Sequence, residues 1–219
     1  MQDIGKAFTY MFEDENWVTK ILLGGVFILL SVILIGIPFW VGYMVEIVQN
    51  VLAGRPKPLP EWTNLGDKFI KGLILVVAII IWLIPSFILS GIGSGFQAAA
   101  GPRGGGGLVA IGFLFSCLST IYSILFYLIL PAIFIKYAQQ PDFGSAFKIN
   151  DFISMITGNI GNYIVVLVLS IVAHIIAAFG LIALCIGFLF TSFWAYLVSA
   201  HLYGQLGRAA GITTPTTTS

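Results

Sequence analysis

Charged side chains are scarce in this sequence, and that scarcity decides its broad class. Asp, Glu, Lys and Arg make up 9% of the 219 residues, whereas hydrophobic residues make up 58%. The mean hydropathy is +1.02. Such a chain has too little polar surface to cover a soluble globule of its length, so its solvent must be a lipid bilayer. The composition therefore predicts an all-α integral membrane protein, because helices satisfy their own backbone hydrogen bonds in lipid.

Cysteine is also rare, and the residue groupings that carry chemistry are missing. Cys117 and Cys185 both stand inside apolar runs, with no CxxC pair and no histidine at a metal-ligand spacing. The sequence also lacks Ser/His/Asp, Cys/His and paired-carboxylate arrangements, and it has no basic patch interleaved with aromatic residues. We therefore expect no enzymatic activity, no cofactor, no metal site and no nucleic-acid partner.

Long apolar runs dominate what is present. As one helix, residues 21–53 would measure about 50 Å, far more than the hydrocarbon thickness of about 30 Å. This run must therefore bend or fold back, and Pro38 marks the expected break. Residues 73–89 and 108–135 each suit one crossing. Residues 163–203 would measure about 60 Å as a helix and must cross twice.

The distribution of basic residues indicates how the first run crosses. If residues 21–53 form a hairpin, nine of the ten basic residues lie on one side of the membrane and only Arg103 lies opposite. If the run crosses once, the split is seven against three. The positive-inside rule favours the hairpin, which predicts about six spans in the cell membrane with both termini in the cytoplasm. Five spans are the alternative, because each arm has only about 17 residues and the second arm has the amphipathic pattern of an interfacial helix.

A short motif is written twice in the chain. Residues 3–8 read DIGKAF and residues 142–147 read DFGSAF. Each copy begins an amphipathic segment, each segment runs into an apolar hairpin, and each hairpin closes on an arginine. We interpret this pattern as a parallel internal repeat, in which each copy is a cytoplasmic in-plane helix followed by a hairpin. Biased composition with ordinary amphipathic helices is the alternative explanation.

These features predict one polytopic membrane domain over residues 1–212. Its parts are a first repeat at 1–55, a central amphipathic segment with a helical hairpin at 56–141, and a second repeat at 142–212. Residues 213–219 read TTPTTTS and are predicted to be a disordered tail.

Tryptophan is favoured at the headgroup level of a bilayer, where its ring meets lipid and its N–H meets water. Trp62 falls on the apolar face of a short helix that is predicted to follow the extended, proline-rich start of PKPLPEWTNLGDKFIK. The predicted interfacial anchors are Trp17, Trp40, Trp62 and Trp194.

Three ionisable side chains are set well within apolar runs, namely Glu46, His174 and His201. Ionisable groups are costly in hydrocarbon, so these three form the candidate intramembrane polar site. His174, in the middle of a predicted span, is the best candidate for handling protons. A neutral imidazole hydrogen-bonded to a neighbouring helix is the alternative interpretation of the same residue.

Small residues indicate where helices approach one another. Gly91 and Gly95 have the small-xxx-small spacing that lets helix backbones come close. Ser116, Ser119 and Ser123 recur near one face of the next predicted helix. These five residues are the predicted helix-packing positions.

Three segments carry a family resemblance: DIGKAFTYMFEDENW, GYMVEIVQNVLAG followed by LPEW, and FWAYLVSAHLYGQLGRAAG. In these segments the chain resembles the bacterial and archaeal multi-pass membrane proteins of domain-of-unknown-function family 4013. The resemblance covers nearly the whole length. It implies a prokaryotic membrane protein and assigns no site residues, because the family has no established activity.

Three classes of function remain. The first is a non-enzymatic accessory or scaffold subunit that packs laterally against other membrane protein subunits, or against itself, in the lipid bilayer. The second is a small transporter or channel for an apolar or weakly polar substrate, since parallel repeats occur in carriers. The third is an intramembrane enzyme, for which the sequence offers no catalytic arrangement. The first class is the expected one.

Overall fold

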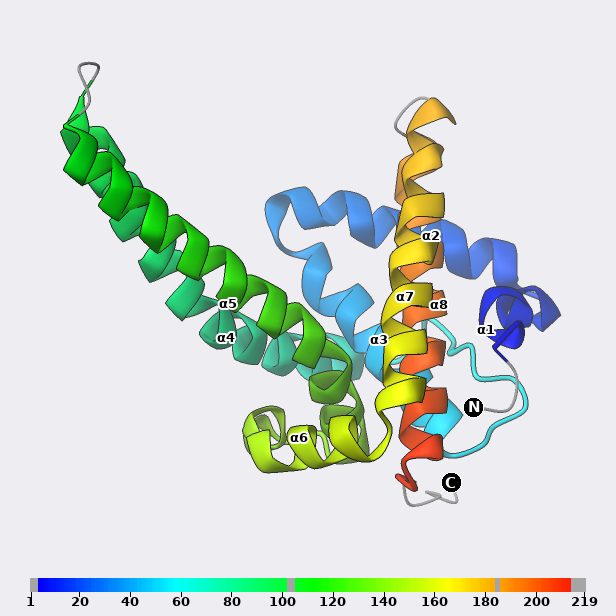
Figure 1. The fold of residues 1–219 in the computed structure, drawn as a ribbon. Helices are drawn as coiled ribbons and strands as arrows, with labels where there is room; N and C mark the ends of the chain where they lie inside the picture. The colour runs from blue at the N-terminus through cyan, green and yellow to red at the C-terminus, as the bar shows by residue number, and fades with distance from the viewer. Residues whose placement is uncertain (1–3, 102–104, 184–185, 214–219) are drawn as a thin grey trace. The chain divides into compact units, whose positions relative to one another are not determined.

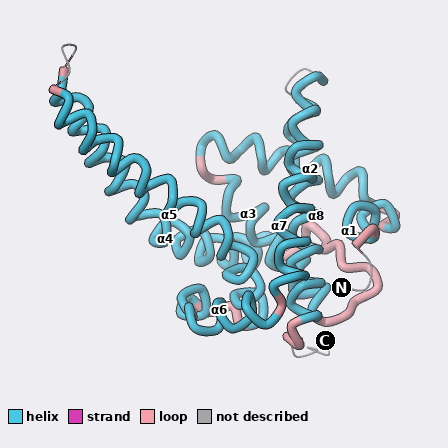
Figure 2. The backbone as a smooth tube through the Cα atoms, viewed as in Figure 1, coloured by secondary structure: helices cyan, strands magenta, loops and turns pink. Residues whose placement is uncertain are grey.

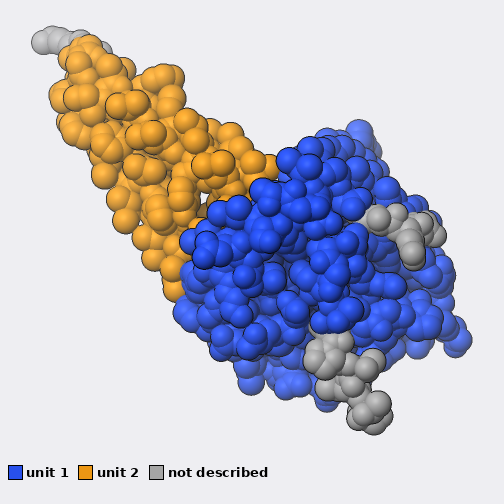
Figure 3. Space-filling model, turned by 60° about the horizontal axis from the view of Figure 1, so that its bottom comes forward, with its two compact units in different colours: residues 1–76, 131–219 blue, residues 77–130 orange. Residues whose placement is uncertain are grey.

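The computed structural model describes residues 4–101, 105–183 and 186–213, and within these ranges every regular element is a helix (Figures 1 and 2). The predicted all-α class is therefore confirmed. The chain divides into two compact units, drawn in different colours in Figure 3. Unit 1 comprises residues 1–76 and 131–219, and unit 2 comprises residues 77–130. Cys185, Arg103 and most of the 213–219 tail lie outside the described residues.

Among the residues that the structure describes, ten helical elements lie wholly in unit 1, five before unit 2 in the chain and five after it. The first five are α1 Lys6–Thr9, η1 Tyr10–Glu13, α2 Trp17–Leu30, η2 Ser31–Ile33 and α3 Gly36–Leu52. The other five are η3 Phe143–Phe147, α6 Ile149–Gly158, α7 Ile160–Ala178, η4 Phe179–Ala183 and α8 Ile186–Ala209. The two remaining helices are α4 Leu65–Ala100 and α5 Gly106–Gln139, which begin or end in unit 1 and form unit 2 between them.

Helix α8 is the centre of unit 1. Helices α2, α3 and α7 all pack against it, and Figure 1 shows α7 and α8 running side by side while α2 crosses them. Its side chains Phe193, Leu197 and Leu202 are fully buried. Small residues allow the close approach of α2, because a Cβ added at Gly24 would collide with the ring of Phe193.

The first apolar run folds back on itself, but the break comes before Pro38. Helix α2 gives way to η2 and then to Leu34, whose φ of 65° is left-handed. Pro38 lies in the first turn of α3, where the missing N–H costs no helix hydrogen bond. A Cβ at Gly36 would collide with the carbonyl oxygen of Phe27, so this glycine permits the tight return. The predicted break at the proline is therefore wrong by a few residues.

Three helical segments are long and apolar enough to cross a membrane: Leu65–Ala100, Gly106–Gln139 and Ile160–Ile182. A fourth span results if Lys6–Glu13 and Trp17–Ile33, which meet at an angle of 110°, count as one broken span. Among the described residues, length and composition thus support three or four spans, fewer than the predicted six. Helix α3 has 17 residues, which is short for a crossing.

Helices α3 and α8 end in the same way. Gly54 and Gly211 follow them with φ of 71° and 76°, a conformation that glycine adopts without strain. In each case the glycine N–H and the next N–H bond back to carbonyls of the last turn: Gly54 to Val51 and Arg55 to Asn50, then Gly211 to Arg208 and Ile212 to Gly207. This pair of hydrogen bonds is the Schellman motif, which stops both helices sharply.

Helix α3 crosses the start of α4 with backbone touching backbone. A Cβ at Gly42 would collide with the carbonyl oxygen of Lys68, and one at Gly72 would collide with that of Pro38. Glycine is therefore required on both sides of this crossing, which brings α3 and α4 close enough for the ion pairs described below.

We predict that Gly72→Ala destabilises the protein by about 1–3 kcal/mol, because the added methyl forces α3 and α4 apart. Gly66→Ala, in the first turn of the same helix, is the matched control, since a Cβ there meets nothing within 4 Å. The control should be neutral or slightly stabilising, because alanine favours helix. Denaturant titration of both variants in mixed micelles measures the difference. Equal effects of the two changes would contradict the backbone contact.

Candidate functional site

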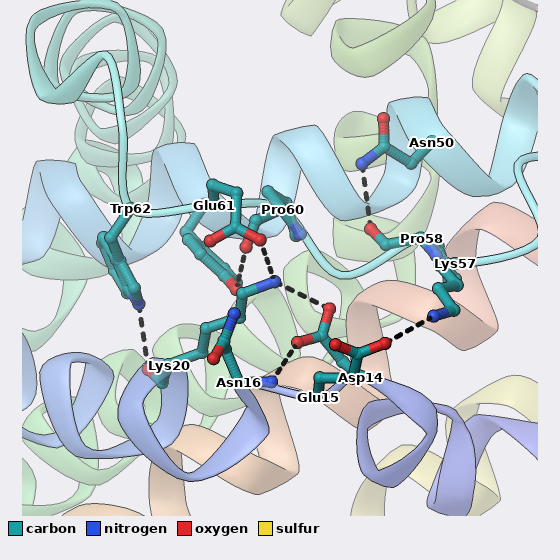
Figure 4. Close-up of polar contacts among 11 residues, drawn as sticks. Asp14, Glu15, Asn16, Lys20, Asn50, Lys57, Pro58, Pro60, Glu61 and Trp62 are labelled. Carbon is teal, nitrogen blue, oxygen red and sulfur yellow. Dashed lines mark hydrogen bonds and ion pairs between the residues drawn. The ribbon is translucent and has the colours of Figure 1, made fainter.

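Lys20, in the first turns of α2, is a buried charge that joins three segments. Its side chain is 3% exposed, and its ammonium nitrogen lies 2.7 Å from Asp14 Oδ2 and 2.6 Å from Glu61 Oε1 (Figure 4). Its backbone carbonyl accepts a 2.9 Å hydrogen bond from Trp62 Nε1. A buried ammonium needs such partners, because leaving water is costly for an unpaired charge. Glu61 thus attaches the α3–α4 connection, residues 53–64, to α2, and Asp14 attaches the loop that precedes α2 to the same ammonium group.

The α3–α4 connection is extended because it contains three prolines, and side chains satisfy its carbonyl groups. Tyr43 donates its hydroxyl to the carbonyl of Pro60 at 2.7 Å, and Asn50 donates its amide to that of Pro58 at 2.9 Å. The second of these bonds is visible in Figure 4. Backbone oxygens that no helix or strand can satisfy find partners in this way. The connection is therefore a fixed part of unit 1.

Aromatic stacking reinforces the same attachment. The Trp62 ring stacks on Phe27 and Tyr43, with centroid separations of 4.7 Å and 4.2 Å, and it lies 5.9 Å from Phe193. These rings come from α2, α3 and α8. Trp62 therefore joins the α3–α4 connection to three helices through its stacked and tilted ring contacts and its N–H.

Glu46, predicted as part of an intramembrane polar site, is paired with two lysines. Its carboxylate lies 2.8 Å from Lys68 Nζ and 3.6 Å from Lys71 Nζ. Lys68 is 3% exposed at its side chain and also donates to the carbonyl of Thr63 at 2.8 Å. These ion pairs hold α3 against α4 at the glycine crossing. Glu46 is therefore a structural carboxylate whose charge is balanced by two lysines.

The charges and hydrogen bonds around Lys20 favour the charged form of the Asp14 carboxylate. Burial alone would raise the pKa of Asp14, but its hydrogen bonds to the Lys20 ammonium and the Asn16 backbone N–H, together with the charges of Lys20 and Lys57, lower that pKa. Asp14 lies in the loop between η1 and α2. The ion pair with Lys20 is accordingly intact at neutral pH.

His201 lies elsewhere in unit 1, beside a cavity of about 520 Å³. The histidine is buried, its ring stacks on Tyr10 at 4.4 Å, and its Nδ1 lies 3.2 Å from Gln205 Nε2. The cavity is lined by Lys6, Val51, Arg55, Pro56, Pro58, Asn162, His201, Gln205, Arg208 and Ala209. Three of these residues are cations and none is acidic.

His174 lies on the outer surface of α7, not among the buried residues. Its Nδ1 is 2.7 Å from the carbonyl oxygen of Ser170 one turn earlier, and its ring stands edge-on to Tyr196 at 5.3 Å. The carbonyl can only accept, so Nδ1 carries the hydrogen. The structure therefore does not bring Glu46, His174 and His201 together into one site.

The four predicted anchor tryptophans are half-buried and in contact with other aromatic rings. Trp17 stands edge-on to Phe12, and Trp194 is tilted against Phe8. Trp40 stacks on Tyr196 and donates its Nε1 hydrogen to Ser31 Oγ at 3.1 Å. With Trp62, these residues pack within unit 1, whatever part of their surface meets lipid.

In unit 2 the predicted serines lie in the contact between the two helices. Ser86 Oγ lies 3.0 Å from Ser119 Oγ and 2.8 Å from Ser123 Oγ. Ser116 accepts a 3.3 Å hydrogen bond from Gln97. These hydroxyl groups pair across the hairpin in an otherwise apolar setting.

The glycines that bring these two helices together are different from the predicted pair. A Cβ at Gly91 or Gly95 would meet nothing within 4 Å, whereas one at Gly93 would lie 2.9 Å from the carbonyl oxygen of Gly112. Gly93 stands between the two predicted glycines in sequence, so it faces a different side of the helix.

Sequence reasoning missed the buried lysines, Lys20 and Lys68. A signal was present, because Lys20 opens an apolar run four residues after the end of the acidic FEDEN segment, and Lys68 precedes another run. Arg55 and Arg208 entered the sequence argument as topology markers and as the arginines that close the two repeats, not as site residues. In the part of the chain that the structure describes, no group of three or more His, Cys, Asp or Glu could hold a metal ion, and Cys117 is a half-buried free thiol.

We predict that Glu46→Gln costs on the order of 3 kcal/mol of unfolding free energy, because it leaves the buried Lys68 ammonium without its carboxylate. Glu15→Gln is the matched control, since Glu15 is 91% exposed and reaches Lys57 only at 4.0 Å. The control should have no measurable effect. Restoration of stability in Glu46→Gln/Lys68→Met would confirm the coupling. If the losses of unfolding free energy from Glu46→Gln and Lys68→Met simply add in the double variant, the coupling between the two side chains is contradicted.

Comparison with known proteins identifies a family without identifying an activity. No curated protein and no solved structure matches the chain. The family model described as "Protein of unknown function (DUF4013)" matches residues 25–186, from α2 to the start of α8. That match covers 162 of the 219 residues (186 − 25 + 1). The chain therefore belongs to the DUF4013 family, as its sequence resemblance indicated.

Proposed function

We propose that this protein is a non-enzymatic accessory or scaffold subunit that packs laterally against other membrane proteins. The observation that carries the proposal is the surface of unit 2. Large apolar side chains are exposed on both of its helices, with Phe87 at 66% and Phe113 at 65%. Further exposed residues are Ile80, Ile84, Ile88, Leu114, Ile121, Ile124, Leu125 and Tyr127.

A two-helix hairpin cannot bury such a surface by itself. The polar groups of its contact face are already paired, as Ser86 with Ser119 and Ser123 and as Tyr122 with the carbonyl of Trp82 at 2.6 Å. The remaining surface is apolar and accepts lipid or another apolar helix. A hairpin whose polar groups are hydrogen-bonded to one another suits a packing role better than a transport role.

We also propose that both termini are cytoplasmic and that the α2–α3 segment enters and leaves the membrane on the cytoplasmic side. Lys6, Arg55 and Arg208 line one cavity, and Lys20 pairs with Glu61 of the α3–α4 connection. A single crossing by residues 21–53 would put Lys6 and Lys20 on the opposite side from Arg55 and Glu61. The short α2 and α3 then form a hairpin, the six-span topology, with α1 and α6 as in-plane helices.

Cysteine labelling tests this topology in a background without Cys117 and Cys185. The exposed positions Glu15→Cys and Lys57→Cys should react from the same side, and Arg103→Cys should react from the other. Membrane-impermeant maleimide applied to intact cells and to inverted vesicles gives the readout. Labelling of Glu15→Cys and Lys57→Cys from opposite sides would establish the five-span alternative instead.

The parallel repeat belongs to the same proposal. Its support is that α3 and α8, the second arms of the two hairpins, end in the same Schellman motif and pack on each other. In the duplicated motif, Ala7 and Ala146 are both fully buried. Biased composition alone gives no reason for matching caps at matching places.

A small transporter is the second candidate, and the repeat is the observation that favours it. The described spans offer little for a polar substrate, because Glu46 is neutralised by lysines and His174 bonds its own helix. Any cargo would have to be apolar or weakly polar. The accessory role therefore stands first.

Assembly is the direct test. Mild-detergent extraction from native membranes should yield a stoichiometric partner, and a photo-crosslinker placed at the exposed Phe113 should reach it. The same crosslinker at Phe126 is the control, since that side chain is 4% exposed in the same unit. His174→Leu should leave partner capture unchanged. A monomer that crosslinks only to lipid, with a transport signal in liposomes that His174→Leu abolishes, would overturn the accessory role in favour of a carrier.

A further inference from the structure

We propose that the cavity lined by Lys6, Arg55 and Arg208 binds a phosphate-bearing anion. The three cations come from α1, from the residue after the α3 cap and from the last turns of α8. They are 49 and 153 residues apart in sequence (55 − 6 and 208 − 55), yet they line one space of about 520 Å³. This inference does not depend on the accessory role.

The pairing of charges in the rest of the protein sets the two arginines apart. Five lysines each have a carboxylate oxygen within 4.0 Å: Lys20, Lys57, Lys68, Lys71 and Lys136. Across the residues that the structure describes, no carboxylate lies that close to the guanidinium of Arg55 or Arg208. Lys6 reaches Glu13 at 3.7 Å, and both side chains of that pair are substantially exposed. The cavity therefore carries uncompensated positive charge from this part of the chain.

The rest of the wall suits a hydrogen-bonding anion. Asn162, His201 and Gln205 contribute side chains that can donate hydrogen bonds. His201 is buried and oriented by its stack on Tyr10 and its contact with Gln205. A cavity whose wall combines cations and neutral donors, with no acidic residue, discriminates against cationic ligands.

Two arginines favour phosphate over a simple carboxylate. A guanidinium presents parallel N–H groups that match two oxygens of one phosphate, and the tetrahedral group offers lone pairs on more than one side, so a second guanidinium can bind it as well. The fixed caps of α3 and α8 position both arginines without any ligand, since Gly54 and Gly211 stop their helices sharply. The simpler alternative is that each arginine only complements the negative end of its own helix.

The phosphate could belong to a lipid headgroup or to a soluble molecule. Basic pockets beside membrane helices on the cytoplasmic side bind anionic headgroups. A volume of about 520 Å³ exceeds that of one phosphate and equally fits a small phosphorylated metabolite. The shared chemistry is the phosphate group, and the experiment separates the two sources.

The test compares the full chain with Arg55→Gln/Arg208→Gln, using Lys57→Gln as the matched control. Lys57 is an exposed cation two residues from Arg55 that does not line the cavity. Arg55→Lys/Arg208→Lys keeps the charge and removes the forked geometry. The probes are inorganic phosphate, nanodiscs of phosphatidylglycerol and nanodiscs of phosphatidylcholine. The readouts are the thermal unfolding midpoint and native mass spectrometry of bound lipid.

We expect phosphate or phosphatidylglycerol to raise the unfolding midpoint of the wild type and of Lys57→Gln, with affinity at least about tenfold weaker in the Gln double variant. The Lys double variant should lie between them. Protection by inorganic phosphate identifies a soluble ligand, and protection by phosphatidylglycerol alone identifies a headgroup. If neither probe binds, or if Lys57→Gln and the Gln double variant lose the same amount of affinity, the proposed site is overturned. Each arginine would then only complement the negative end of its own helix.

Discussion

The pairing of buried lysines is the constraint on which the rest of unit 1 depends. Lys20 and Lys68 each place an ammonium group where only 3% of the side chain is exposed. An unpaired charge in that environment would cost several kcal/mol, so carboxylates must be brought to it. Asp14 and Glu61 meet at Lys20, and Glu46 meets Lys68. Together these pairs fix the positions of α2, α3, the α3–α4 connection and the start of α4.

Glycine makes this charge pairing geometrically feasible. Glu46 and Lys68 lie on helices whose backbones touch at Gly42 and Gly72, so a short carboxylate can reach a buried ammonium. The same device operates at α8, where Gly204 lies against Val51 of α3. In a chain with little polar surface, helices cannot rely on hydrophobic burial alone to select partners, because lipid is equally apolar. Close approach at glycines and paired charges supply that selectivity.

The sequence predicted what depends on composition and local pattern, and it failed where partners come from distant segments. The helical class and the family followed from apolar runs and motifs and are confirmed. Glu46 was singled out as an ionisable group in an apolar run, but its partners are 22 and 25 residues away (68 − 46 and 71 − 46) on another helix. The choice of Gly93 over Gly91 and Gly95 depends on the rotation of two packed helices, which spacing does not define.

The same contrast explains why the basic cavity escaped the sequence argument. Arg55 and Arg208 were counted for topology because the positive-inside rule treats cations as interchangeable. The fold distinguishes them. Most lysines in unit 1 are paired with carboxylates that hold helices together. Arg55 follows the end of α3 and Arg208 lies in the last turn of α8, and both side chains line the cavity. In a protein with ten basic residues, those that do not stabilise the fold are the ones available for a ligand.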